Sequence, residues 1–192
     1  MTCIGIVIGA GTIIGIILEK SGAAYRMAEV VLRVIGPKRP QLAMSIIGYI
    51  VSIPVFCDSG YIILTSLKKA LAKRAGVTIA SMAVALATGL YATHVLVPPT
   101  PGPIAAAGNI GAADYLGTII LIGLIVAIPA TIVGYIWATK VASKIRVEAD
   151  DEPALDYDEI IKSFGKMPST FKSFLPIVLP IVLIGAGSVA AL

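Results

Sequence analysis

The chain has 192 residues, of which 57% are hydrophobic and 14% are charged, with a formal net charge of +4 at pH 7. A soluble domain carries about 25% charged residues, so this composition excludes an ordinary water-soluble fold and predicts an all-α membrane protein. The cations lie in short loops between apolar runs, without interleaved aromatic residues, and we therefore expect a lipid bilayer as partner and no nucleic acid.

Five apolar segments follow one another along the chain, at 3–18, 42–67, 77–97, 115–139 and 174–192. Because a membrane-spanning helix needs about 20 apolar residues, 3–18 and 115–139 are predicted to be transmembrane helices. The chain opens inside the first apolar segment, directly after Met1 and without a basic leader. This start is unlike a signal peptide, and we expect the chain to be a piece of a longer protein.

The stretch 22–36 has an apolar side and a charged side at helical spacing. The apolar side holds Ala23, Met27, Val30, Val31 and Val34, and the charged side holds Arg26, Glu29 and Arg33. An amphipathic helix of this kind lies in the plane of the membrane surface. We therefore predict an interfacial helix over 22–36.

Three charged stretches separate the apolar segments. Residues 19–39 hold five cations, 68–74 hold four, and 140–172 hold six. Loops rich in Lys and Arg face the cytoplasm, so both sides of 42–67 are predicted to be cytoplasmic and this segment must enter the membrane and return. Pro54 breaks a helix and Gly60 permits a turn, which predicts a re-entrant helical hairpin with its tip at Asp58, Ser59 and Gly60.

A cluster of prolines interrupts the third apolar segment. Four of the six residues at 98–103 (PPTPGP) are proline, and a helix cannot continue through them. A second helix can begin after Pro103, since proline is favoured in a first turn. The sequence therefore predicts one discontinuous membrane helix over 77–113, with an unwound middle.

Asp58 is the one acid or base within the segment 42–67. A charge inside the membrane is costly and usually lines the path of an ion or substrate, which makes Asp58 a candidate proton- and substrate-binding residue. The alternative is an acid at a helix end that faces water. His94 is a second candidate, because histidine exchanges protons near neutral pH and this one precedes the proline cluster. A buried core histidine is the alternative there.

The breaks in these helices are predicted to bind the substrate. Broken helices expose N–H groups and the positive end of the helix dipole, which bind carboxylates without a basic side chain. Polar side chains and glycines at the breaks complete the predicted site, and for the hydroxyls and the amide a helix-capping role is the alternative. These residues are Ser59, Gly60, Thr93, Thr100, Gly102 and Asn109.

A channel and an intramembrane enzyme are two alternatives to a carrier. The spacing of Cys3, Cys57 and His94 matches no metal site, and we expect neither a metal nor a cofactor. An intramembrane protease would need a second catalytic acid, but Asp114 lies at the end of a segment, so we expect no enzyme. A channel would have no need of a titrating acid such as Asp58. A membrane channel and an intramembrane enzyme stay the alternatives to the carrier.

Four stretches of the chain resemble conserved stretches of the gluconate permease family. They are residues 9–15 (GAGTIIG), 19–23 (EKSGA), 54–61 (PVFCDSGY) and 92–106 (ATHVLVPPTPGPIAA). The last of them is the most specific, because it combines a Thr-His pair with the pattern Pro-Pro-x-Pro-Gly-Pro. The resemblance extends over essentially the whole chain.

This resemblance implies a secondary active transporter that takes up gluconate, or a related sugar acid or hydroxy-carboxylate, together with protons. It implies a multi-pass protein of the bacterial inner membrane, with two inverted repeats that each contain a hairpin and a broken helix. Family members are more than twice as long as this chain. The resemblance therefore implies a first-repeat core at 1–139, a cytoplasmic linker at 140–173 and the first helix of the second repeat at 174–192. A homo-oligomer is left open.

Overall fold

The computed structural model describes residues 13, 16–18, 20–36, 38–147, 159, 162 and 167–190. Their regular secondary structure is helical throughout, as the composition predicts. The α-helices are α2 (Ala23–Ile35), α3 (Pro40–Val51), α4 (Cys57–Ile63), α5 (Thr65–Ala75), α6 (Ile79–Leu96), α7 (Pro101–Asn109), α8 (Leu116–Lys140) and α10 (Thr170–Ala190). Two short 3₁₀ helices, η1 (Ala113–Tyr115) and η2 (Ala142–Lys144), flank α8.

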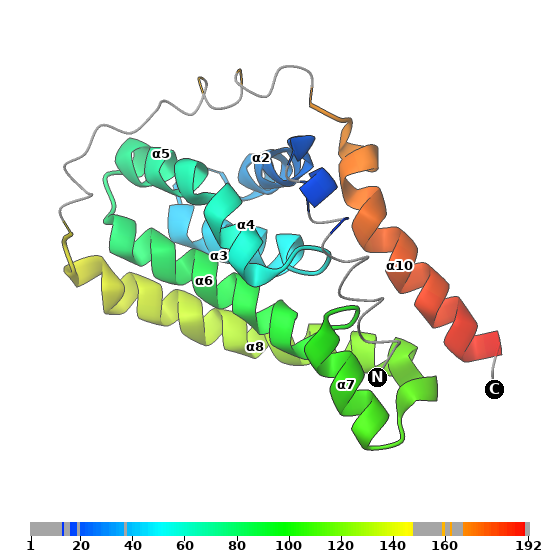
Figure 1. Ribbon diagram of the computed structural model, residues 1–192. Helices are drawn as coiled ribbons and strands as arrows, with labels where there is room; N and C mark the ends of the chain where they lie inside the picture. The colour runs from blue at the N-terminus through cyan, green and yellow to red at the C-terminus, as the bar shows by residue number, and fades with distance from the viewer. Residues whose placement is uncertain are drawn as a thin grey trace.

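Helix α6 lies at the centre of the fold, with α3 packed on one side and α8 on another (Figure 1). Helices α4 and α5 also pack against α6, and α10 contacts both α2 and α8. Large side chains from several of these helices fill the core, among them Met27, Met44, Leu64, Leu86 and Leu90. The core is therefore built around α6, the helix that precedes the proline cluster.

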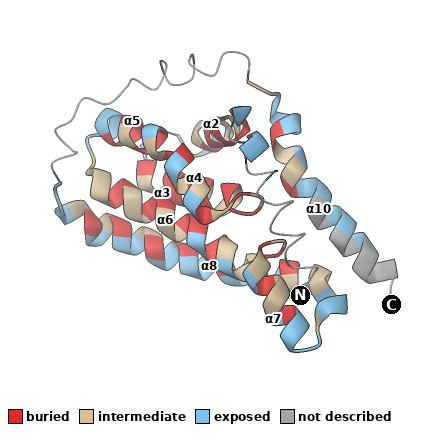
Figure 2. Ribbon diagram, in the orientation of Figure 1, coloured by how far each residue is buried: buried red, intermediate tan, exposed pale blue. Residues whose placement is uncertain are grey.

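Two stretches are long and apolar enough to cross a membrane, Ile79–Asn109 with 31 residues and Ala113–Lys144 with 32 residues. The second contains α8, which begins and ends within a residue of the prediction. Its outer face is exposed and apolar (Figure 2), with side chains such as Leu121, Ile125 and Val133. An apolar surface of this extent suits contact with lipid.

Glycines allow the central helices to approach one another closely. A Cβ on Gly48 would lie 2.6 Å from the carbonyl oxygen of Leu86, and a Cβ on Gly89 would overlap the carbonyl oxygen of Ser45. In the same way, a Cβ on Gly123 of α8 would overlap the backbone of α6. Small residues at helix crossings are typical of membrane helices, and here they position α6 between α3 and α8.

The break between α3 and α4 lies at Ser52–Phe56, and the predicted tip at Asp58, Ser59 and Gly60 is wrong by a few residues. Helix α3 ends at Val51, just before Pro54, which lacks an N–H for the helical ladder. Asp58 and Gly60 belong to α4 instead. Gly60 serves close packing, since a Cβ there would lie 2.9 Å from the Leu90 side chain.

The prediction of a discontinuous helix is confirmed at 77–113. Helix α6 is capped at its start by Thr78, whose Oγ1 accepts a hydrogen bond from the Ser81 N–H at 3.3 Å. It ends at Leu96, before the prolines, and α7 begins at Pro101 rather than after Pro103. Proline fits the first position of a helix because the N–H it lacks has no partner there, which accounts for the earlier start.

Helix α2 confirms the prediction of a helix within 22–36, and α10 begins four residues before the predicted 174–192. Met27 and Val31 of α2 are buried, whereas Val34 is 81% exposed and does not share their face. The predicted helix at 3–18 lies outside the described residues except for 13 and 16–18. Half of the predicted linker at 140–173 also lies outside them.

Candidate functional site

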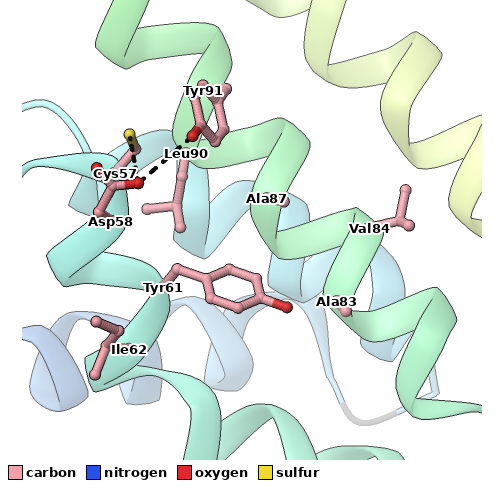
Figure 3. A pocket seen from close by; sticks show the side chains of 9 residues that line it. All are labelled: Cys57, Asp58, Tyr61, Ile62, Ala83, Val84, Ala87, Leu90 and Tyr91. Atoms are coloured by element: carbon pink, nitrogen blue, oxygen red, sulfur yellow. Dashed lines mark hydrogen bonds between the residues drawn. The ribbon is translucent and has the colours of Figure 1, made fainter.

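A cavity of about 440 Å³ opens between α4 and α6 (Figure 3). Helix α4 and the residues around it contribute one wall and α6 contributes the other. The lining residues are Cys57, Asp58, Tyr61, Ile62, Ala83, Val84, Ala87, Leu90 and Tyr91. The wall from α6 is mostly small and apolar, so the polar chemistry of the cavity comes from Asp58, Tyr61, Cys57 and Tyr91.

Asp58 stands in the first turn of α4, which begins at Cys57. A carboxylate is favoured at this position because the N-terminal end of a helix carries a partial positive charge. The Asp58 side chain is exposed, and its Oδ1 accepts a hydrogen bond from Tyr91 Oη at 3.5 Å and one from Cys57 Sγ at 3.8 Å. Helix packing thus brings an acid, a phenol and a thiol together.

Tyr61 follows Asp58 by about one helical turn and lies on the same cavity wall (Figure 3). Its Oη accepts a hydrogen bond from Lys68 Nζ at 3.0 Å, and the same nitrogen lies 4.3 Å from the centre of the tyrosine ring. Lys68 belongs to α5 and is only 5% exposed. A buried cation therefore stands directly behind a phenol that lines the cavity.

His94 lies one turn after Tyr91 on α6 and faces the start of α4. The centre of its ring is 5.7 Å from the ring centre of Phe56, which immediately precedes α4. Its Nδ1 is buried and has no hydrogen-bond partner among the described residues. Asp58 is close enough to His94 to interact with it electrostatically. The two predicted proton-binding residues are thus brought to one junction of α4 and α6.

Of the predicted site residues, Asp58 alone lines this cavity, and His94 lies outside its lining. Thr93 is fully buried and donates to the carbonyl oxygen of Tyr49 at 3.0 Å, and Thr100 donates to that of Val97 at 2.6 Å. Both hydroxyls therefore satisfy backbone carbonyls near the break in the helix. Gly102 and Asn109 are exposed on α7, while Ser59 is half-buried and Gly60 buried on α4.

Tyr61, Lys68 and Tyr91 belong to the site but were missed from the sequence. Lys68 was assigned to a cytoplasmic basic stretch, because four cations within 68–74 suggest a solvated loop. The sequence does contain a signal for Tyr61, since this residue follows Asp58 at helical spacing within the stretch 54–61 that resembles gluconate permeases. Within the described residues, no group of three His, Cys, Asp or Glu side chains is placed to hold a metal ion.

Comparison with known protein families matches residues 1–192 to the family described as GntP family permease. A permease of Haemophilus influenzae, described as uncharacterized, is 44% identical over 189 residues, covering 94% of this chain and 38% of the relative. The gluconate permease of Pseudomonas aeruginosa is 34% identical, with 87% of this chain and 35% of the relative covered. The low-affinity gluconate transporter of Escherichia coli K12 is 30% identical, with 98% and 41% covered.

The chain thus spans between 35% and 41% of the length of these three relatives. No solved structure matches it. The match over all 192 residues agrees with the resemblance to gluconate permeases that the four sequence stretches indicate, and with a membrane protein that has two apolar helices long enough to cross a bilayer.

Proposed function

The chain belongs to the GntP permease family, and from that premise we propose that it forms one part of a proton-coupled carrier for gluconate or a related hydroxy-carboxylate. The carrier acts as a multi-pass protein of the bacterial inner membrane. The names of two relatives, a gluconate permease and a low-affinity gluconate transporter, support this substrate class. The substrate binds in the cavity between α4 and α6.

The observation that carries this proposal is the environment of Asp58. Its carboxylate opens into a cavity of about 440 Å³ and accepts hydrogen bonds from Tyr91 and Cys57. Pockets for small molecules begin at about 300 Å³, so a six-carbon sugar acid fits. An acid in a membrane segment usually marks the path of a proton or substrate. Asp58 is the residue we assign to proton binding, with His94 as the competing candidate.

The arrangement of helices supports the inverted-repeat architecture that the resemblance implies. In this proposal, α3, the turn at Ser52–Phe56 and α4 form the re-entrant hairpin, and α6 with α7 forms the discontinuous helix of the first repeat. Residues 1–139 are the first-repeat core, 140–173 the cytoplasmic linker, and α10 the first helix of the second repeat. The chain covers less than half of each relative, so each relative is long enough to contain a second repeat.

Counterflow in proteoliposomes tests the proposed function. The full-length permease is reconstituted into vesicles loaded with unlabelled gluconate, and a trace of labelled gluconate is added outside. A carrier alternates its access and gives a transient accumulation of label inside, whereas a channel gives simple equilibration. The accumulation should be absent with a neutral sugar as internal load. Equilibration without a transient, or no gluconate-dependent flux at all, would contradict the proposed carrier.

A further inference from the structure

The polar groups of the cavity between α4 and α6 divide into two kinds along α4. At the start of the helix, Asp58 presents a hydrogen-bond acceptor with Tyr91 beside it. One turn later, Tyr61 presents a phenol with the ammonium group of Lys68 behind it. Asp58 and Tyr61 both line the cavity (Figure 3). The cavity therefore has a carboxylate at Asp58 and a positive charge close to Tyr61.

Lys68 carries a positive charge, and no acidic side chain pairs with it in the part of the chain that the structure describes. Its side chain is 5% exposed, and its printed hydrogen bond goes to the neutral phenol of Tyr61. The ion pairs found among the described residues both involve Glu29 on α2. A buried ammonium group costs free energy unless an opposite charge compensates it. An anion bound in the adjoining cavity would supply that charge.

The direction of the hydrogen bond between Lys68 and Tyr61 determines what Tyr61 can offer. An ammonium group has donors and no acceptor, so Lys68 donates and the Tyr61 oxygen accepts. The proton of the Tyr61 hydroxyl is then left to donate elsewhere, and the positive charge behind it strengthens that donation. Because Tyr61 lines the cavity, a bound carboxylate is a suitable acceptor for this proton.

We propose that Tyr61, held by Lys68, binds the carboxylate of the substrate, while Asp58 and Tyr91 bind its hydroxyl groups. Tyr61 contacts the substrate, and Lys68 acts through Tyr61 as a positioning residue. This orientation keeps the carboxylate of the substrate away from the carboxylate of Asp58, and like charges close together would oppose binding. The inference rests on the proposed function and assigns the orientation of the substrate in its site. It selects monoanions that carry a hydroxyl group several carbons from the carboxylate.

The test compares a charged ligand with a neutral ligand of the same shape. Equilibrium binding of labelled gluconate to the purified full-length permease is measured in competition with gluconate and with gluconamide, its neutral amide. Hydrogen bonds to a charged group contribute more to binding than bonds between neutral groups. Tyr61→Phe and Lys68→Met should therefore weaken gluconate binding about 10-fold or more, and gluconamide binding about 3-fold or less. The ratio of gluconate affinity to gluconamide affinity should therefore fall in both variants.

Two further variants separate this role from a structural one. Lys68→Arg keeps a positive charge beside Tyr61, so it should retain more of the preference for gluconate than Lys68→Met does. Lys73→Met removes an exposed cation from the same helix, α5, and should leave both affinities unchanged. Tyr61→Phe keeps the ring and serves as the test if Lys68→Met does not fold.

Two negative results have different meanings. In the first case, the wild-type permease binds gluconate, but the ratio of gluconate affinity to gluconamide affinity in Tyr61→Phe stays within about 2-fold of wild type. That change is smaller than the loss of one net hydrogen bond. The proposed orientation is then wrong, and the proposed function stands. If the wild-type permease binds neither gluconate nor any other sugar acid or hydroxy-carboxylate tested as a competitor, the proposed function is wrong as well.

Discussion

Asp58 and Tyr91 lie 33 residues apart in the chain, yet the phenol donates to the carboxylate across the cavity. Together with Cys57 Sγ, it holds the carboxylate oxygen in place, and Asp58 forms no ion pair within the part of the chain that the structure describes. Under the proposed function, an anionic substrate in this cavity would still repel an ionised Asp58, even with its own carboxylate directed toward Tyr61. Proton binding and substrate binding are therefore expected to support one another, which is what coupled transport requires.

Replacement of Asp58 tests this coupling. Asp58→Asn imitates the protonated acid, so the full-length permease should keep substrate exchange but lose accumulation driven by a proton gradient. In the wild type, acidic external pH favours the protonated, loaded state, and concentrative uptake should fall as external pH rises. The measurement is uptake of labelled gluconate against external pH, with exchange in the absence of a gradient as control. Unchanged accumulation with an unchanged pH profile in Asp58→Asn would place coupling at another residue.

His94 allows the two candidate couplers to be distinguished. Its ring packs near Phe56, and its buried Nδ1 has no partner among the described residues. If Asp58 carries the coupled proton, His94→Gln should shift the pH optimum of uptake without abolishing accumulation. If His94 carries it, the two variants should exchange phenotypes, and His94→Gln should exchange substrate without accumulating it. The same uptake assay across external pH separates the two outcomes.

The sequence predicts Asp58 and His94 as candidate proton-binding residues, because a titratable residue in an apolar segment can be recognised without a structure. It could not predict Tyr91, since the partner of Tyr91 is distant in sequence and tyrosine is common in membrane helices. Lys68 was missed for a different reason. Because Lys68 is followed by Lys69, Lys73 and Arg74, the sequence predicts that it belongs to a solvated loop. Only the packing of α5 shows that the Lys68 side chain is buried.

At the scale of helices, the crossing of α3 and α6 depends on two glycines. The backbones approach so closely that a Cβ on Gly89 would overlap the Ser45 carbonyl oxygen, and a Cβ on Gly48 would lie 2.6 Å from the Leu86 carbonyl oxygen. Backbone atoms cannot rotate away as a flexible side chain can. An added methyl group must therefore push the two helices apart.

Alanine at these glycines should destabilise the permease. Overpacking costs about 1–3 kcal/mol, so Gly89→Ala and Gly48→Ala should each lower the melting temperature by several degrees. A larger separation of α6 from α3 would also change the shape of the cavity beside α6, so gluconate binding should weaken. Gly102→Ala is the matched control, because a Cβ there meets open space. Equal thermal stability for Gly89→Ala and Gly102→Ala would contradict this account of the crossing.

Helix α2 offers a pH-dependent test of a surface network. Glu29 lies 2.5 Å from both Arg26 and Arg33. Burial acts to raise the pKa of Glu29, but the hydrogen bonds and charges of the two arginines outweigh it, and the pKa is lowered from its usual value. A carboxyl whose pKa is lower in the folded state stabilises that state above its unfolded pKa, near 4.3. The stabilisation is lost as pH falls through the folded value.

Glu29→Gln should therefore lower the melting temperature at pH 7, and its difference from wild type should shrink as the pH falls below about 4. The effect should be small, because Arg33 is largely exposed and surface ion pairs contribute little. Asp114→Asn serves as a control, since Asp114 is exposed and forms no ion pair in the described part of the chain. A difference between Glu29→Gln and wild type that does not change with pH would refute the role of the ion pairs.

Helix boundaries were predicted best where proline or a change from apolar to charged residues sets them. Helix α8 follows the edges of the apolar segment, and α6 ends just before Pro98. The break near Pro54 was predicted, but its position was not. The sequence pattern predicts a turn at Asp58 and Gly60, whereas the acid lies in the first turn of α4 and the glycine packs against Leu90. Such tertiary reasons do not show in a local sequence pattern.

At the scale of the whole molecule, the path of the chain through the membrane can be tested with two exposed lysines. Lys38 precedes α3 and Lys73 lies in the last turn of α5. If α3 and α4 form a re-entrant hairpin, both lysines face the cytoplasm. Single cysteines at these positions, in a cysteine-free permease, should react with a membrane-impermeant maleimide only in inside-out vesicles. Reaction at either position in intact cells would contradict the hairpin.

This chain is expected to supply only part of the transport site. The cavity is lined from α4 and α6, and its polar groups are confined to the side of α4 and to Tyr91. In an inverted-repeat carrier the substrate lies between two hairpins, so we propose that the remaining wall comes from a second repeat. The chain covers between 35% and 41% of three relatives, which agrees with a site completed by further sequence.

Expressed alone, the 192-residue chain should therefore insert into the membrane but show no saturable uptake of labelled gluconate. Co-expression with the rest of the permease as a separate polypeptide should restore uptake if the two parts assemble. Saturable, proton-dependent uptake by the chain alone would show that the cavity between α4 and α6 is sufficient, or that two copies of the chain complete one site. Cross-linking of the active species would distinguish those two cases, because only the second requires a dimer.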